Sequence, residues 1–214
     1  MILKKQTVGP FQMNCYILGC EETREGVIID PGDEVDLLLK IIEEEGIRLR
    51  AILNTHAHID HVSGVEEIKR RKGIPFYLHK GDLFWLDHLK EKAEMFGLPV
   101  PLKPQVDHYL EEGNQFSFGK HSLKVLHTPG HTPGAVTFVM DRGQTGMPVP
   151  RAFVGDCLFA GSIGRTDFPG GSYPELIQTI KTKILPLGDD TVIHSGHGPD
   201  TTVLQERLYN PFLQ

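Results

Sequence analysis

The chain has 214 residues, of which 39% are hydrophobic, and we expect residues 1–214 to form one domain with a substantial core. Its 28 acidic and 22 basic residues give a net charge of −6, and no basic run is present, which disfavours nucleic acid as a partner. No segment has the apolar length of a membrane span or the pattern of a secretion signal. We therefore expect a cytoplasmic protein without membrane contact, and its oligomeric state stays open.

The first half of the chain is predicted to alternate strands with helices. Residues 2–30 are typical of strands, and the last of these strands ends in Asp30. The β-α-β order that follows predicts local parallel pairing. The aromatic residues Phe84, Trp85 and Phe96 either pack in the core or form a wall of a substrate cleft. In this half we expect strands at 12–18, 26–30, 50–53 and 75–79, and helices at 37–45, 62–72 and 82–95.

The most informative stretch runs from Thr55 to His61 and reads T-H-x-H-x-D-H. An apolar run that is predicted to be a buried strand just precedes this stretch, so these side chains lie at a strand end. In an extended chain His56 and His58 project to one side at the two-residue period, while Asp60 and His61 begin the next turn. This spacing predicts metal binding, and it suits two adjacent metal sites rather than one.

Strand ends and turns in the second half carry three more potential ligands. His131 lies between two Pro-Gly pairs, which form a rigid loop between strands. Asp156 ends a buried run, and His197 lies in a Ser-Gly-His-Gly turn. In this half we expect antiparallel strands at 115–118, 123–127 and 135–140, a polar loop at 144–150, strands at 152–156 and 191–194, and helices at 174–185 and 203–209.

Seven potential ligands therefore lie at strand ends, more than one tetrahedral ion requires: His56, His58, Asp60, His61, His131, Asp156 and His197. Nitrogen and carboxylate donors without sulfur admit zinc, iron or manganese, and we expect two divalent ions, zinc first. The three cysteines form no Cys-x-x-Cys pair, and only Cys157, next to Asp156, is a weaker potential ligand. Because structural zinc sites are usually closed and rich in cysteine, a non-catalytic metal-binding protein is the less favoured alternative.

The motifs at Thr55–His61 and Thr128–Gly134 resemble those of the metallo-β-lactamase superfamily. The resemblance implies an α+β fold, a four-layer αββα sandwich with the site at one edge. It also implies that His56, His58 and His131 hold one metal, that Asp60, His61 and His197 hold the other, and that Asp156 bridges them. Asp60 would further orient the hydroxide bound there. From the residues alone, Asp30 is either a solvated turn residue or a carboxylate that orients a loop or a ligand. The resemblance favours the orienting role.

Residues 158–168 and 206–212, together with the metal motifs, resemble glyoxalase II-like hydrolases of the short bacterial type over essentially the whole chain. Those enzymes hydrolyse hydroxyacyl-glutathione thioesters such as S-lactoylglutathione. The resemblance therefore predicts a small-molecule thioester substrate and attack on its carbonyl by a metal-bridging hydroxide. A thiolate leaves readily, so no dedicated general acid is required.

Arg165 follows Gly164 at the place where glyoxalase II proteins carry a lysine that contacts glutathione, so the resemblance predicts that it binds substrate. The alternative is a surface salt bridge to Asp167, worth about 0–1 kcal/mol. Full-length glyoxalase II proteins also carry a C-terminal helical domain with basic residues, whereas this chain ends 17 residues after His197. Glutathione as the thiol carrier therefore stays open.

Persulfide dioxygenases are the second interpretation. They share the run Gly164–Phe168 and bind a single iron, for which His56, His131 and Asp156 resemble a set of two histidines and one carboxylate. The Gly-His-Gly turn around His197 favours the hydrolases, because the dioxygenases usually carry a bulkier, acidic sequence after this histidine.

Overall fold

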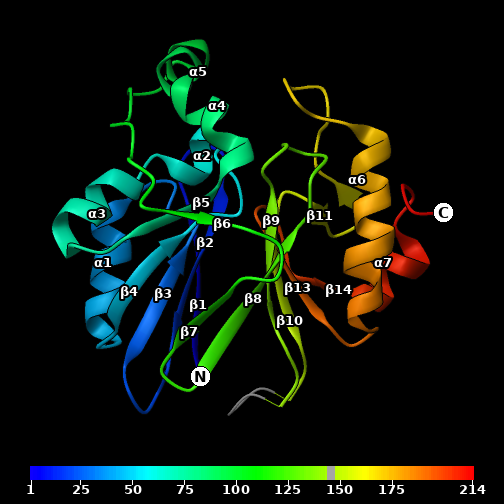
Figure 1. Cartoon of the computed structure of the whole chain (residues 1–214), viewed down its shortest axis with the longest axis horizontal. Coiled ribbons are helices and arrows are strands. Elements are labelled where there is room, and N and C mark those ends of the chain that lie inside the picture. Colours follow the sequence, from blue (N-terminus) through cyan, green and yellow to red (C-terminus); the bar gives the residue numbers. More distant parts are fainter. Residues whose placement is uncertain (144–147) are drawn as a thin grey trace.

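The computed structural model describes residues 1–143 and 148–214. Two six-stranded sheets face each other, and helices cover the outer face of each sheet (Figure 1). The layers thus follow as helices, sheet, sheet and helices, which confirms the expected α+β sandwich. Of the polar loop expected at 144–150, residues 144–147 lie outside the described part of the chain.

The first sheet is antiparallel on one side and parallel on the other. Its strands lie in the order β1 (Ile2–Val8), β2 (Met13–Gly19), β3 (Glu25–Ile29), β4 (Arg48–Leu53), β5 (Phe76–His79) and β6 (His108–Leu110). The strands β3 to β6 pair in parallel, which confirms the prediction from the β-α-β order. The edge strand β6 was not predicted, because two of its three residues are exposed and give no apolar run.

The second sheet is mostly antiparallel. Its strands lie in the order β14 (Thr201–Thr202), β13 (Val192–Ser195), β10 (Arg151–Gly155), β9 (Val136–Met140), β8 (His121–His127) and β7 (Gln115–Phe118). The exception is the parallel pair β10 and β13. A two-stranded hairpin of β11 (Leu158–Phe159) and β12 (Ser162–Ile163) follows β10. The expected antiparallel strands are confirmed, whereas β14 and the hairpin are too short to show a sequence pattern.

Helices form the two outer layers and cover one edge of the sandwich. The first sheet is covered by α1 (Val35–Glu44) and α3 (Val65–Lys72), and the second by α6 (Tyr173–Thr179), the π-helical η2 (Ile180–Ile184), the short η3 (Leu185–Leu187) and α7 (Val203–Tyr209) (Figure 1). At the edge lie α2 (Ile59–Val62), η1 (Lys80–Asp82), α4 (Leu83–Asp87) and α5 (Leu89–Phe96). None of the helices in the described residues is long and apolar enough to cross a bilayer.

Two helices expected to be continuous are divided. The helix expected at 62–72 is broken between α2 and α3, where the amide of Gly64 donates to the carbonyl of Pro31 at 3.0 Å and a Cβ would lie 2.6 Å from that oxygen. The helix expected at 82–95 is broken at His88, whose Nδ1 hydrogen-bonds the Phe84 carbonyl at 2.8 Å. At Gly64 a tertiary contact thus replaces a helical hydrogen bond, whereas at His88 the side chain adds a second bond to the Phe84 carbonyl and a backbone φ of −104° interrupts the helix.

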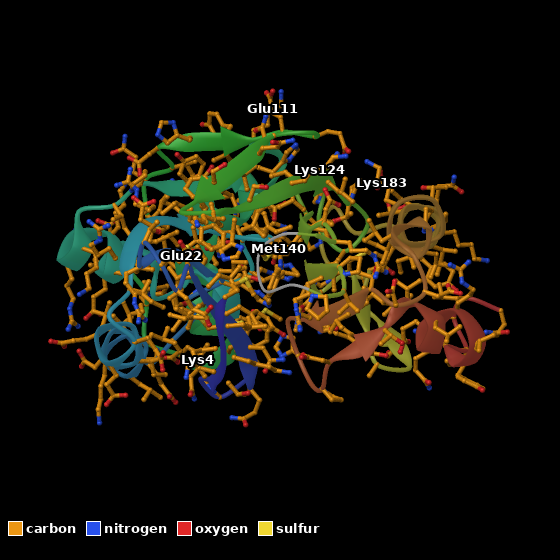
Figure 2. All side chains as sticks on the ribbon, turned by 90° about the horizontal axis from the view of Figure 1, so that it is seen from below. Lys4, Glu22, Glu111, Lys124, Met140 and Lys183 are labelled. Carbon is orange, nitrogen blue, oxygen red and sulfur yellow. The ribbon has the colours of Figure 1, made fainter. Side chains whose placement is uncertain are left out.

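The central strands, such as β2, β3 and β9, are buried on both faces, which explains their continuous apolar runs. In β3, Ile28 packs against the helices outside, whereas Val27 and Ile29 face the second sheet. Between the sheets, Phe138 and Phe153 fill the centre. The end of the sandwich away from α4 and α5, seen from below in Figure 2, shows the sheets edge-on between the outer helices. A strand buried on two sides needs no alternation with polar residues, so the register is set by packing.

We predict that two adjacent leucines of α1 contribute very differently to stability. Leu38 is completely buried against the first sheet, whereas Leu37 is 36% exposed. Leu38→Ala should lower the free energy of unfolding by about 2–5 kcal/mol, because it leaves a cavity. Leu37→Ala, the matched control, should change it by only about 0.5 kcal/mol. Urea denaturation of both variants measures the difference, and equal losses would show that α1 is not packed as described.

Candidate metal centre

Four segments that directly follow strands supply the seven predicted donors. The segment after β4 supplies His56, His58, Asp60 and His61, and the turn after β8 supplies His131. Asp156 follows β10 and His197 follows β13. Because β10 and β13 are parallel, their carboxyl ends bring the last two donors to the same edge.

The structure brings all seven donors together in overlapping groups. Within each group the potential ligand atoms lie within 4.8 Å of one another. The groups are His56, His58 and His131; His56, His61 and Asp156; and Asp60, His61 and His197. The first and the third group correspond to the two sets of ligands that the resemblance implies.

The carboxylate of Asp156 lies between these two sets. One of its oxygens, Oδ2, is 3.6 Å from Nε2 of His131 and 3.5 Å from Nε2 of His197. The other oxygen, Oδ1, is 3.4 Å from Nε2 of His61. Asp156 thus has the position that a bridging ligand requires.

Hydrogen bonds fix the ring orientation of four histidines. In each, Nδ1 has a protein partner, which leaves Nε2 for the centre: Arg165 O for His131 (2.7 Å), Phe11 O for His197 (3.1 Å), Asp30 Oδ2 for His61 (3.1 Å) and Thr55 Oγ1 for His56 (3.1 Å). A carbonyl only accepts, so Nδ1 of His131 and of His197 carries the proton. Such outward bonds are typical of metal-ligating histidines, because they set the tautomer.

His58 has the opposite orientation and provides the clearest test of whether the site fits a metal. Its Nδ1 lies 3.2 Å from Nε2 of His56 and 2.9 Å from Nε2 of His131. One proton on Nδ1 of His58 can form a hydrogen bond to the Nε2 of one of these neighbours, but not to both. In the described part of the chain, Nε2 of His61 and Oδ1 of Asp156 are buried without a hydrogen-bond partner. Lone pairs that converge without donors are what cations satisfy, so the residues fit metal ions.

The electrostatics of the donors also suit metal ions. Burial, the largest effect, lowers the pKa of His56 and His58, so both rings are neutral and offer a lone pair. Burial also acts on His61, but the charges of Asp156 and Asp60 outweigh it and raise the pKa of His61. In turn, His61 outweighs burial and lowers the pKa of Asp156, which is therefore ionised. The neutral imidazoles of His56 and His58 beside ionised carboxylates attract cations, and a bound cation would displace the proton that the carboxylates hold on His61.

Asp30 lies beneath the histidine segment and not in solvent, since it is only 2% exposed. Its Oδ1 accepts from the Thr55 amide at 2.7 Å, and its Oδ2 accepts from the Thr55 hydroxyl at 2.6 Å. The same Oδ2 is the partner of His61. The backbone of Asp30 has a φ of 52°, an unfavourable conformation for this residue type, which these three contacts offset. The geometry is that of an orienting carboxylate.

Asp82 is a second buried carboxylate of this kind, and the sequence analysis missed it. It precedes α4 but makes no helix-capping hydrogen bond. It accepts instead from the Ala57 amide (2.9 Å), the Thr132 hydroxyl (2.9 Å) and the Gly134 amide (2.6 Å). Burial raises its pKa to about 6, against these three donors. Asp82 thus connects the segment with His56 and His58 to the loop that carries His131. The one signal for it in the sequence was its place after a strand, which it shares with Asp30 and Asp156.

Two glycines allow the close packing around the centre. A Cβ at Gly32 would lie 1.5 Å from the carbonyl oxygen of Asp60. A Cβ at Gly196 would lie 2.2 Å from Oδ1 of Asp156. Any larger residue at these positions would displace a donor.

A cavity of about 150 Å³ opens beside the donors. It is lined by Phe11, His58, Ile59, Asp60, Trp85, Lys92, Phe96, Arg165 and Phe168. Trp85 and Phe96 therefore belong to the wall that the sequence suggested, whereas Phe84 is 46% exposed and stacks on His88 outside it. A larger cavity of about 520 Å³ beside α1 contains none of the seven donors.

Arg165 lies in the cavity wall, but an acid already engages it. Its Nε and its terminal NH2 nitrogen donate to the two carboxylate oxygens of Asp167, both at 2.7 Å. Its guanidinium carbon lies 3.8 Å from the ring centroid of Phe168. The salt bridge is thus present, as the alternative interpretation expected. Cys157 belongs to none of the donor groups found in the described residues, and burial raises the pKa of its thiol to about 12.

Fold and donors together define a protein of the metallo-β-lactamase type. The family model described as the metallo-beta-lactamase superfamily matches residues 8–197. The chain therefore belongs to this superfamily, whose members are mostly metal-dependent hydrolases.

Three relatives have similar identity to the chain, and the two that carry functional names differ in function. Hydroxyacylglutathione hydrolase GloC of Haemophilus influenzae is 40% identical, over 96% of this chain and 95% of its own. The crystal structure of TTHA1623 in a di-iron-bound form has a TM-score of 0.87 at 40% identity, covering 98% of this chain and all of its own. The crystal structure of BLEG-1, a B3 metallo-beta-lactamase, has a TM-score of 0.89 at 38% identity and full coverage of both. Family membership alone therefore does not identify the substrate.

A relative of another reaction class is also similar. The mitochondrial persulfide dioxygenase ETHE1 of Homo sapiens is 34% identical over 99% of this chain and 76% of its own. The second interpretation of the sequence thus has a relative of its own.

We predict that Asp82→Asn weakens metal binding. The side-chain amide of the variant would turn its hydrogens toward groups that are themselves donors, which loosens the two donor-bearing loops. Orienting residues of this kind typically contribute about 10–100-fold in metal affinity. The matched control is Asp87→Asn at the end of α4, where Asp87 pairs with Lys103 at the surface. Competition with a chelator measures the affinity of both variants. Unchanged affinity in Asp82→Asn would show that the two loops do not depend on this carboxylate.

Proposed function

We propose that the protein is a metal-dependent thioesterase that hydrolyses hydroxyacyl-glutathione thioesters, of which S-lactoylglutathione is the first to test. The observation that carries the proposal is the position of Asp156 between two complete donor sets beside an open cavity. The similarity to the hydroxyacylglutathione hydrolase of Haemophilus influenzae over nearly the whole chain supports the choice of substrate.

In this proposal each donor set holds one divalent ion. His56, His58 and His131 hold the first, Asp60, His61 and His197 hold the second, and Asp156 contacts both. The donors suit zinc, which we propose first, and also iron or manganese. When bound, such ions lower the pKa of water and stabilise the negative charge that develops on a thioester carbonyl.

Asp60 has a second role in the proposal, because it faces both the donors and the cavity. Its Oδ2 lies 3.2 Å from Nε2 of His197. Burial acts to raise the pKa of Asp60, but His61 and His197 outweigh it and lower this pKa, so the carboxylate is ionised. An ionised carboxylate accepts a hydrogen bond from the attacking water and thereby fixes its direction toward the substrate.

The cavity suits the thiol side of a thioester. Trp85, Phe96 and Phe168 exclude water from the scissile bond, and the guanidinium hydrogens of Arg165 that do not face Asp167 are available to substrate oxygens. Cysteine-type thiols have a pKa near 8.5, so the thiolate leaves without protonation by a side chain.

The second candidate is a persulfide dioxygenase with one iron, favoured by the similarity to the human enzyme. It would use His56, His131 and Asp156. The second donor set is assembled as closely as the first, however, and a single ion leaves its buried Nε2 of His61 unsatisfied. A purely structural metal site is disfavoured because two donors, His58 and Asp60, line the cavity.

We predict that the protein binds two ions per chain and that Asp156→Ala loses both, because the bridging carboxylate serves both sets. Metal analysis after reconstitution with zinc, iron or manganese measures this stoichiometry. Asp36→Ala, which removes an 89% exposed acid paired with Arg71, is the control and should retain both ions.

The same preparations decide between the two reactions. The native protein should hydrolyse S-lactoylglutathione, and Asp156→Ala should reduce this rate to background. Oxygen uptake with glutathione persulfide by a protein that never holds more than one ion would replace the thioesterase with the dioxygenase. Full hydrolysis by Asp156→Ala would refute the assignment of the centre.

A further inference from the structure

Two cations line the cavity, Lys92 on α5 and Arg165 in the opposite wall. They differ in how their charge is compensated. Arg165 makes a two-point salt bridge to Asp167, so its charge is already neutralised by the protein. Lys92 has no carboxylate within 4.0 Å in the described part of the chain. The ammonium of Lys92 therefore has no carboxylate in direct contact, although Asp60, one of the potential metal donors, lines the same cavity.

The surroundings of Lys92 hold its ammonium group against aromatic rings. Its Nζ lies 5.2 Å from the ring centroid of Trp85 and 5.3 Å from that of Phe168. Contacts with two ring faces stabilise a cation and restrict its movement. Apolar walls also lower the local dielectric, so an anion that enters the cavity interacts with this ammonium more strongly than with an exposed lysine.

The second lysine of α5 lies in a different environment. Lys90 is 74% exposed and lies 3.9 Å from Glu94, one turn further along the helix. A surface lysine of this helix thus finds an acid of its own, whereas the partly buried Lys92 points into the cavity without one. Other lysines of the described residues also lack a carboxylate within 4.0 Å, but Lys92 is the one that lines this cavity and lies against two aromatic rings.

We propose that Lys92 binds a carboxylate of the substrate and makes the protein selective for thioesters whose thiol part carries a free carboxylate, as glutathione does. This inference rests on the proposed thioesterase activity and specifies the substrate class. The cavity of about 150 Å³ is below the roughly 300–1,000 Å³ of sites that enclose a whole ligand. It therefore accepts only the short part of the substrate that carries the carboxylate, while the rest of the substrate stays outside the cavity.

The test uses two thioesters that differ by one carboxylate, S-lactoyl-N-acetylcysteine and S-lactoyl-N-acetylcysteamine. For the metal-loaded native protein, kcat/KM should be higher for the anionic thioester. Lys92→Met should reduce the ratio of the two kcat/KM values by about tenfold, which corresponds to about 1.4 kcal/mol, through KM rather than kcat. Lys92→Arg should keep most of the preference. Lys90→Met removes the same charge from the same helix and should leave the ratio unchanged.

A binding measurement separates failure of this inference from failure of the proposed activity. Trp85 is the single tryptophan of the chain, so its fluorescence reports occupation of the cavity without turnover. S-methyl-N-acetylcysteine should quench it at lower concentration than S-methyl-N-acetylcysteamine, and Lys92→Met should remove the difference. If neither thioester is hydrolysed but this difference is present, the anion site stands and the thioesterase proposal fails. An unchanged ratio and unchanged quenching in Lys92→Met would overturn the role of Lys92.

Discussion

Convergence of seven polar side chains at one edge of the sandwich, four buried and three partly buried, is the constraint on which the rest of the structure depends. Each buried imidazole or carboxylate costs free energy unless its polar atoms have partners. The protein itself satisfies outward-facing atoms of four of the histidines, for example through Asp30 and the Arg165 carbonyl. The atoms that face inward converge on one another, an arrangement that suits a cation. Metal binding and the stability of this edge are therefore coupled.

The donors could be predicted because they occur in short sequence patterns that are typical of metal ligands. His56 and His58 stand two residues apart after an apolar run, and Asp156 ends another run. A strand end fixes where such a residue lies, since parallel strands share an edge. The layers and the grouping of the ligands came from the resemblance to the superfamily. The structure places the donors in those groups and the helices and sheets in those layers.

The remaining features depend on contacts between residues far apart in the chain. Asp82 is the first residue of the helix expected at 82–95, but its partners Thr132 and Gly134 are about fifty residues away. The break before α3 depends likewise on contact of Gly64 with Pro31. Arg165 was assigned from its position in a motif, and only the structure shows that Asp167 occupies two of its donors. Local patterns do not contain such information, because packing determines it.

The charges of the centre and of the whole molecule act in opposite directions on an anionic substrate. The chain has a net charge of −6, which repels anions at long range. Within the proposed centre, two divalent cations exceed the charge of the carboxylates Asp60 and Asp156, so the loaded site is locally positive. Salt screens the long-range repulsion over about 10 Å at 0.1 M, but it screens contacts in a partly closed cavity much less. A lysine placed beside that centre without a carboxylate in direct contact, as Lys92 is, adds to the attraction where screening is weakest and so favours an anionic substrate over a neutral one.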